Sequence, residues 1–401
     1  MKRVFIVDAK RTAIGTFLGT LKDRTPAELG SVVVKNILET TSLDPAKVDE
    51  LICGNILMAG HKQGIGRQVE ILAGIPDSIP AYSVNMLCGS GMKAVMNAYA
   101  DIQSNFADIV IAGGTESMSN TPYLVPSNIR SGSKMGHFTT VDHMINDALT
   151  DAFSGVHMGV TAENIATKYN ISRAEQDAFA IASQQKAIAS VDAGAFKDEI
   201  VPVVIKTRKE EIVFDTDEYP NRKTNLDKLG TLRPAFVKDG TVTAGNASGI
   251  NDGAAFLMVA SEDAVKANNL KPLVEIIGLG QGGVDPQVMG LGPVPAIRNC
   301  LKNAGLKLED MDIIELNEAF AAQSLGVIHE LCEEHGVTKE WILERTNITG
   351  GAIALGHPVG ASGARIIVTL IHNMLKSGKK LGLASLCIGG GMGTAIIVKL
   401  I

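Results

Sequence analysis

The feature that most constrains the fold is an internal repeat, because the last third of the chain follows the same order of segments as the first. Each copy has a helix that begins at Pro-Ala, a leucine six residues before an aspartate, a strand that ends at asparagine, a small-Ser-Gly turn and a strand that stops at glycines. The matching segments are, in order, Pro26-Ala27 and Pro295-Ala296, Leu43 to Asp49 and Leu306 to Asp312, Asn55 and Asn317, Gly89-Ser90-Gly91 and Ala361-Ser362-Gly363, and Ile111-Ala112-Gly113-Gly114 and Cys387-Ile388-Gly389-Gly390. Five matches in one order indicate a duplicated unit. We therefore expect two similar halves that face each other, with a site between them.

Strands and helices alternate within each copy, which predicts an α/β layered fold. We expect a first half over residues 1–271 and a second half over residues 272–401. Within the first half, residues from about 120 to 248 change in character and begin with a stretch rich in Pro, Gly and Ser. This stretch predicts an inserted loop domain, whose strongest helix is expected to begin after the capping box at Ser172 and Glu175.

Composition excludes several classes of protein. The 401 residues carry a net charge of −6 and show no basic stripe interleaved with aromatics, which argues against a nucleic-acid partner. No apolar stretch reaches about 18 residues, so we expect no membrane span. The apolar run at the N-terminus is too short for a signal peptide. The 5 cysteines are scattered and form no CxxC pair, which predicts a reducing compartment and a cytoplasmic location.

A possible nucleophile lies at Cys88. The cysteine follows an extended run and precedes a Gly-Ser-Gly turn and a helix-forming segment, so we expect it near a helix N-terminus. This position is expected to lower the pKa of the thiol. The alternative is an ordinary buried cysteine, which is the commoner role for this residue type.

Three further polar residues stand beside glycines or at strand ends. His357 lies between Gly356 and Pro358, which fixes its backbone and leaves space around the ring for a proton transfer with a thiol. Cys387 ends a buried strand before a glycine loop, where a core cysteine is an equally good interpretation. Asn317 could fix a water or a carbonyl, or act only as a helix N-cap.

Two other patterns carry less weight. Residues 278–283 match the GxGxxG dinucleotide pattern, but no helix opens on the third glycine, so we reject that interpretation. Cys53, Cys300 and Cys332 have no comparable setting, and we expect them to serve packing.

Taken together, the motif-bearing segments resemble the thiolase family over nearly the whole chain. No single block is decisive, but their order is highly specific. The matching blocks are residues 85–91 (NMLCGSG), 244–249 (AGNASG), 251–255 (NDGAA), 317–320 (NEAF), 356–358 (GHP) and 387–393 (CIGGGMG).

The resemblance implies a five-layered αβαβα fold and a Claisen condensation of two acetyl-CoA molecules to acetoacetyl-CoA and CoA, with no metal and no cofactor other than CoA as the carrier. His357 would activate Cys88, which becomes acetylated. The backbone N–H groups of Cys88 and Gly389 would hold the oxyanion. Cys387 would remove the α-proton of the second acetyl-CoA, and Asn317 would hold a water at the enolate.

Within the family, the chain resembles the biosynthetic short-chain type, which is usually a homotetramer. The reason is the segment 155–159 (GVHMG), whose counterparts shape a small acyl pocket. The resemblance implies that substrate or CoA is contacted by His157, Met158, Met289, Phe320, Ser248, Leu149, Phe236, Ala244 and Arg222. The segment around Arg222 departs from the family pattern, and residues 329–346 are longer than expected, which predicts a surface insertion.

Three alternatives remain at this point. A degradative 3-ketoacyl-CoA thiolase would use the same chemistry with a wider pocket. A decarboxylating ketoacyl synthase would carry a histidine where Asn317 stands and no cysteine at the position of Cys387. A catalytically silent CoA-binding scaffold would never form an acetyl adduct on Cys88.

Overall fold

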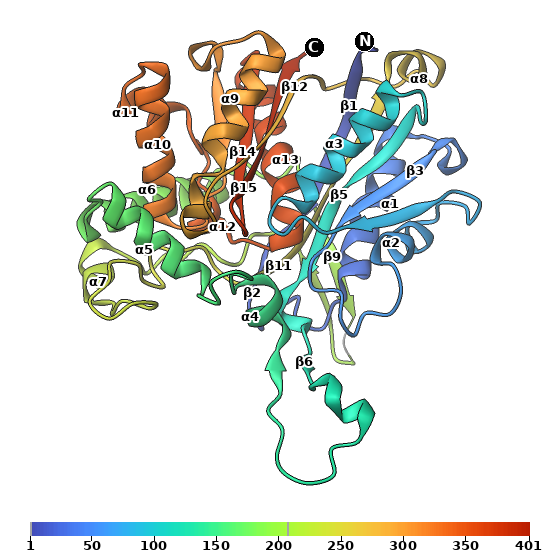
Figure 1. The fold of residues 1–401 in the computed structure, drawn as a ribbon. Helices are drawn as coiled ribbons and strands as arrows, with labels where there is room; N and C mark the ends of the chain where they lie inside the picture. Colours follow the sequence, from blue (N-terminus) through green and yellow to red (C-terminus); the bar gives the residue numbers. More distant parts are fainter. Residues whose placement is uncertain (1, 207) are drawn as a thin grey trace.

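The computed structural model describes residues 2–206 and 208–401, and its main sheet has two parts, one from each half of the chain (Figure 1). The two parts meet where β1 pairs with β12 through Phe5 and Glu275. The first part consists of β1 (Val4–Thr12), β11 (Asn251–Ser261), β5 (Ile109–Ser117), β3 (Glu50–Gly54) and β4 (Ala81–Val84). The second consists of β12 (Val274–Gly283), β15 (Met392–Leu400), β14 (Leu381–Ile388) and β13 (Ile313–Leu316). The short β2 (Gly15–Thr16) and β8 (Ile200–Val201) pair with β11 and β1.

The two parts of the sheet have the same topology. From the shared edge outward, the order β1-β11-β5-β3 matches the order β12-β15-β14-β13. In both, the first two pairings are antiparallel and the third is parallel. The duplication expected from the sequence is therefore confirmed at the level of the strand order.

One aspartate repeats its role in both halves. The Oδ2 atom of Asp49 accepts the backbone N–H groups of Asp108 and Ile109, at 2.8 and 2.9 Å. The Oδ2 atom of Asp312 accepts those of Lys380 and Leu381, at 2.9 and 3.0 Å. Each aspartate thus ties the start of one strand to the start of its parallel neighbour, β3 to β5 in the first half and β13 to β14 in the second.

The helices form three layers around the two parts of the sheet, which confirms the five-layered fold. The central layer is α3 (Ser90–Gln103) packed on α13 (Val359–Ser377), and α13 contacts strands of both parts. The outer layer of the first half is α1 (Pro26–Thr41) with α2 (Ile65–Ala73), and that of the second is α9 (Pro293–Ala304) with α10 (Ala321–His335).

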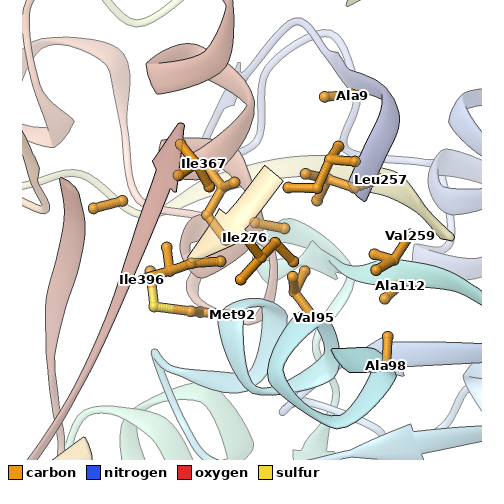
Figure 2. Packing of buried hydrophobic residues seen from close by; sticks show 14 of the residues in the cluster. Ala9, Met92, Val95, Ala98, Ala112, Leu257, Val259, Ile276, Ile367 and Ile396 are labelled. Atoms are coloured by element: carbon orange, nitrogen blue, oxygen red, sulfur yellow. The ribbon is translucent and has the colours of Figure 1, made fainter. Parts of the chain in front are cut away.

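The central core joins both halves in one apolar cluster. Side chains of α3 and α13 pack there against strands of the two parts of the sheet, and Figure 2 shows them converging. Labelled members are Met92, Val95 and Ala98 of α3, Ile367 of α13, Ala9, Ala112, Leu257 and Val259 of the first half, and Ile276 and Ile396 of the second. Because the halves share this core, the ends of α3 and α13 are held rigidly relative to each other.

The two central helices cross at a pair of glycines. A Cβ atom on Gly91 would lie 2.8 Å from the backbone nitrogen of Ala364, and one on Gly363 would lie 2.5 Å from that of Met92. The contact is reciprocal, as a pseudo-twofold relation between the halves requires. The Gly-Ser-Gly and Ala-Ser-Gly segments of the sequence repeat therefore mark the closest approach of α3 and α13.

The inserted residues form a separate lobe of helices and short hairpins. Its helices α5 (Met158–Lys168) and α6 (Arg173–Asp192) pack on α10 and on α12 (Ala352–Leu355) of the second half. The lobe also contains α4 (His143–Ala148), α7 (Leu226–Thr231) and the hairpin β6–β7 (Tyr123–Leu124, Val141–Asp142). The hairpin β9–β10 (Val203–Lys206, Glu211–Phe214) instead packs on the outer core of the first half through Val203 and Phe214. The loop that joins β6 to β7 stands away from the body of the molecule (Figure 1).

Two sequence expectations need correction and one is confirmed. Residues 329–346 are not purely a surface insertion, because they finish α10 and form α11 (Lys339–Arg345), whose Ile342 is fully buried in the outer core. The helix expected to begin at Pro295 begins at Pro293. Residues 278–283 lie in β12, where a Cβ on Gly280 would be 2.2 Å from the carbonyl oxygen of Ala296. These glycines thus allow α9 to pack closely, and the rejection of a dinucleotide motif was correct.

Candidate active site

A single cavity of about 490 Å³ lies where the two halves and the inserted lobe meet. Both halves contribute reactive side chains to it: Cys88 from the first, and His357 and Cys387 from the second. Nine residues predicted to touch substrate or CoA, or to hold the oxyanion, also line it: Gly389, Ser248, His157, Met158, Leu149, Phe236, Ala244, Met289 and Phe320. Further lining residues that the sequence did not indicate include Phe17, Met118, Tyr219 and Ile250.

A strained turn presents Cys88 to this cavity. Leu87 adopts a left-handed conformation, with φ of 48°, which is costly for a residue with a branched side chain. Ser90, the first residue of α3, secures the turn: its hydroxyl accepts the N–H of Met86 at 2.9 Å and donates to the carbonyl of Leu87 at 2.6 Å. Cys88 therefore lies just before α3, as the sequence predicted.

The pKa of Cys88 differs from the expectation. The sequence predicted a lowered pKa, but burial raises the pKa of this thiol to about 11. The nearby backbone N–H groups of Gly389 and Cys88 oppose this rise in pKa, whereas the charge of Glu116 adds to it. Burial outweighs the helix N-terminus here, so the resting group is a thiol. The same two N–H groups can receive an oxyanion formed on an acyl group at this sulfur.

His357 is held so that one ring nitrogen faces the cavity. The hydroxyl of Ser362 donates to the carbonyl of Pro358 at 3.0 Å, and its oxygen lies 2.6 Å from Nδ1 of His357. Because the hydroxyl proton is used at the carbonyl, we assign the proton of the neutral ring to Nδ1. Within the described residues, the buried Nε2 has no hydrogen-bond partner. Burial, with the positive charge of Arg365, lowers the pKa of His357 to about 3. The ring is therefore a neutral base with Nε2 available for a proton.

Cys387 lies at the end of β14, only 1% exposed, among Met158, Met289 and Phe320. Burial raises the pKa of its thiol far above the usual range, and the neighbouring Cys88 raises it further. The two thiols are thus close enough to influence each other. A thiolate formed at Cys387 would be a strong base, because the basicity of the anion follows the pKa of its acid.

Asn317 is 1% exposed and follows β13 directly. Neither Oδ1 nor Nδ2 has a hydrogen-bond partner among residues 2–206 and 208–401. The simple alternative, a helix N-cap, is wrong, because the N-cap of α10 is Phe320. A buried amide in this state can hold a water. Asn317 is not among the residues that line the cavity surface.

An aromatic wall forms one side of the cavity. The ring of His157 stacks on that of Phe236, with centroids 4.7 Å apart, and Phe236 meets Phe320 edge-on at 6.1 Å. A Cβ on Gly159 would lie 2.2 Å from the Phe236 ring, so only glycine allows this contact. The backbone N–H of Ser248 donates to the carbonyl of Ala319 at 2.9 Å, which joins two lining segments.

Arg222 does not line the cavity. It forms an exposed ion pair with Asp192, with N–O distances of 2.6 and 3.0 Å. Its place is an adjoining groove with Lys223 and Lys228, which shares Thr16, Tyr219 and Ala244 with the cavity. The sequence predicted that Arg222 contacts CoA, and the structure places this basic side chain in the adjoining groove rather than in the cavity.

Sequence reasoning missed the residues that hold the site together. Ser362 was noted only as part of a repeat, and neither Glu116 nor the side chain of Asn251 was assigned a role. Asn251 accepts the backbone N–H of His357, and Glu116 accepts that of Gly360. No local sequence pattern indicates these residues, because each contacts a segment that is distant in the sequence.

Within the described ranges, no three histidine, cysteine or acidic side chains are grouped to hold a metal ion. No described helix is both long and apolar enough to cross a membrane.

Two family models cover nearly the whole chain. The model for the N-terminal domain of thiolase matches residues 4–263, and the model for the C-terminal domain matches residues 270–400. The chain belongs to the thiolase family. As a thiolase, it is an acyltransferase, and the resemblance seen in the sequence is confirmed.

Relatives of this thiolase that carry two different names match it over nearly their whole length. An acetyl-CoA acetyltransferase of Chromobacterium violaceum is 52% identical over 397 residues, which cover 99% of each chain. The structure of an acetyl-CoA acetyltransferase from Syntrophomonas wolfei is 43% identical, with a TM-score of 0.97 over 100% of both chains. The human mitochondrial 3-ketoacyl-CoA thiolase in complex with CoA is 44% identical, with a TM-score of 0.93 over 100% of this chain and 98% of the other.

Proposed function

We propose that this thiolase is an acetyl-CoA C-acetyltransferase, which condenses two acetyl-CoA molecules to acetoacetyl-CoA and CoA, reversibly. The observation that carries the proposal is the convergence of Cys88, His357 and Cys387 on one cavity, which Gly389 also lines. The names of the relatives from Chromobacterium and Syntrophomonas support acetyl-CoA as the substrate.

In the first half-reaction, Cys88 takes the acetyl group. Nε2 of His357 accepts the thiol proton while the sulfur attacks the thioester carbon. The N–H groups of Cys88 and Gly389 stabilise the oxyanion, and the C–S bond to CoA then breaks. The proton on His357 passes to the departing CoA thiolate, which leaves acetyl-Cys88 and a neutral imidazole.

In the second half-reaction, a carbon–carbon bond forms. Nε2 of His357, neutral after the first half-reaction, accepts the thiol proton of Cys387, and the resulting thiolate removes a proton from the methyl group of a second acetyl-CoA. The enolate oxygen is stabilised by the protonated His357 and by a water held on Asn317. The enolate carbon attacks acetyl-Cys88 and the Cys88–acyl bond breaks. His357 passes its proton to the Cys88 sulfur, and the proton taken from the substrate leaves Cys387 as a thiol, so acetoacetyl-CoA is released with all three groups in their starting states.

The acyl end of the cavity favours a short chain. The buried Met158 and Met289 pack beside Cys387, and Phe320 completes this wall. The alternative is a degradative 3-ketoacyl-CoA thiolase for longer chains, and the similarity to the human mitochondrial enzyme supports it. Both use the same reaction, so the size of this pocket decides between them.

Thiolysis rates over a series of 3-ketoacyl-CoA lengths test the assignment. We expect kcat/KM for acetoacetyl-CoA to exceed that for long chains by at least about tenfold, the scale on which a pocket discriminates methylenes. Met289→Ala should relax this preference, whereas Met374→Ala, in the core away from the cavity, should lower stability and keep the preference. Equal or higher kcat/KM on long chains in the unmodified enzyme would favour the degradative alternative.

Two further expectations stay predictions. The homotetramer is supported by the β6–β7 loop, which exposes apolar side chains away from the body; Met135 is 95% exposed and Phe138 54%. The cytoplasmic location rests on the cysteine pattern of the sequence alone.

A further inference from the structure

The helix that follows His357 has no N-cap side chain to accept the N–H groups of its first turn. His357 lies just before α13, and among the residues the structure describes, the N-cap Pro358 gives the first turn no side-chain hydrogen bond. The N–H groups at the start of a helix require acceptors from elsewhere. Because His357 must reach Cys88 from the other half of the chain, whatever fixes this segment also fixes the catalytic geometry.

Glu116, in β5 of the first half, supplies one anchor. Its carboxylate is fully buried, and Oε2 accepts the N–H of Gly360, in the first turn of α13, at 3.0 Å. The same oxygen accepts the N–H of Ile56 at 3.1 Å. Oε1 accepts Nδ2 of Asn55 at 2.9 Å and the N–H of Leu57 at 3.2 Å. One carboxylate thus joins the segment after β3 to the start of α13 through four donors.

Asn251, in the adjacent strand β11, supplies the other anchor. Its Oδ1 accepts the backbone N–H of His357 at 2.9 Å, and its Nδ2 donates to the carbonyl of Gly15 at 2.9 Å. A Cβ on Gly356 would lie 2.5 Å from Cγ of Asn251, so the amide packs directly on the chain before the histidine. The two anchors belong to the same half as Cys88, and they hold residues 356–360 of the other half by hydrogen bonds.

We propose that Glu116 and Asn251 are positioning residues of the thiolase reaction, which hold the His357 segment of the second half against Cys88 of the first. Neither side chain lines the cavity, so both act through residues 356–360. The inference rests on the proposed function in one respect, that His357 is the base for Cys88.

Glu116→Gln tests the first anchor. Glutamine has the size of glutamate but only one side-chain oxygen. Its NH₂ group would therefore face N–H groups that donate to the carboxylate in the unmodified protein. We expect kcat for acetoacetyl-CoA thiolysis to fall about 10- to 100-fold, the effect of a small misplacement of a catalytic group, while KM stays within about twofold. The matched control is Asp49→Ala at the opposite end of β5, which removes the acceptor of two backbone N–H groups and should lower stability but keep kcat. Wild-type kcat in Glu116→Gln, or the same kcat in both variants, overturns the proposal.

Asn251→Ala tests the second anchor without any change of charge. The measurement is the rate at which iodoacetamide alkylates Cys88 at pH 8, followed by mass spectrometry, which needs no acyl-CoA. We expect alkylation several-fold slower than in wild type, because at pH 8 little thiolate exists and the neutral thiol reacts only while a correctly placed His357 takes its proton during the attack. A wild-type alkylation rate overturns the role of Asn251. If unmodified protein fails to cleave acetoacetyl-CoA while alkylation still slows in Asn251→Ala, the assigned reaction is wrong and the positioning role stands.

Discussion

At the scale of single residues, the site combines a thiol and an imidazole that both rest uncharged. Burial raises the pKa of Cys88 to about 11 and lowers that of His357 to about 3. Proton transfer from the thiol to Nε2 at rest is therefore unfavourable. The N–H groups of Cys88 and Gly389 stabilise negative charge only when it forms on the sulfur or on an acyl oxygen. In the proposed reaction, thiolate formation at Cys88 is therefore coupled to attack on a bound thioester.

The pH dependence of Cys88 alkylation follows from this state. A raised pKa means that little thiolate exists at neutral pH, and that its fraction grows as pH increases toward about 11. We expect the rate of reaction with iodoacetamide in substrate-free protein to rise continuously from pH 6 to pH 10. Peptide mass spectrometry would follow Cys88, with buried Cys300, which lies outside the cavity, as the unreactive reference. A plateau already reached by pH 7 would instead indicate a resting thiolate–imidazolium pair.

The sequence could predict three side chains that meet in the cavity, but not the residues that support them. Cys88 and His357 stand beside glycines, and Cys387 shortly precedes a glycine-rich loop. Glu116 and Asn251 sit in ordinary buried strands, and their partners Gly360 and His357 are more than a hundred residues away. Only the folded arrangement of the two halves brings these groups together.

At the scale of secondary-structure elements, the sequence predicts a helix start well where neighbouring side chains supply the hydrogen bonds that its first turn needs. The capping boxes Thr25–Glu28 and Ser172–Glu175 start α1 and α6 where the sequence places them. Residues 278–283 show the opposite case. A glycine-rich segment is ambiguous in sequence, and the close approach of α9 resolves it as part of β12.

The crossing of α3 and α13 is the element-scale feature most open to test. In Gly363→Ala, the new Cβ would lie 2.5 Å from the backbone nitrogen of Met92, so the helices must separate. We expect a loss of about 1–3 kcal/mol in the free energy of unfolding, measured in urea, together with reduced kcat. Gly230→Ala in α7, where the space around the glycine is open, is the matched control. Equal stability of the two variants would contradict the tight crossing.

At the scale of the whole molecule, the duplication explains how the site is built. Two halves with one strand order face each other across α3 and α13. The first half brings Cys88 and the two anchors of the His357 segment, Glu116 and Asn251, and the second brings His357, Asn317, Cys387 and Gly389. The inserted lobe closes the cavity with His157, Met158 and Phe236. The five repeated segments predicted two similar halves with a site between them. They could not predict the adjoining basic groove at Arg222, because this groove depends on the tertiary packing of the inserted lobe.

The central claim is that Cys88 carries the acyl group, and intact mass after mixing with acetyl-CoA tests it most directly. We predict a gain of one acetyl group on the unmodified chain and none on Cys88→Ser, with the adduct lost again when CoA is added. An unmodified chain that gains no acetyl group, from either acetyl-CoA or acetoacetyl-CoA with CoA, would contradict the account and favour a silent CoA-binding scaffold.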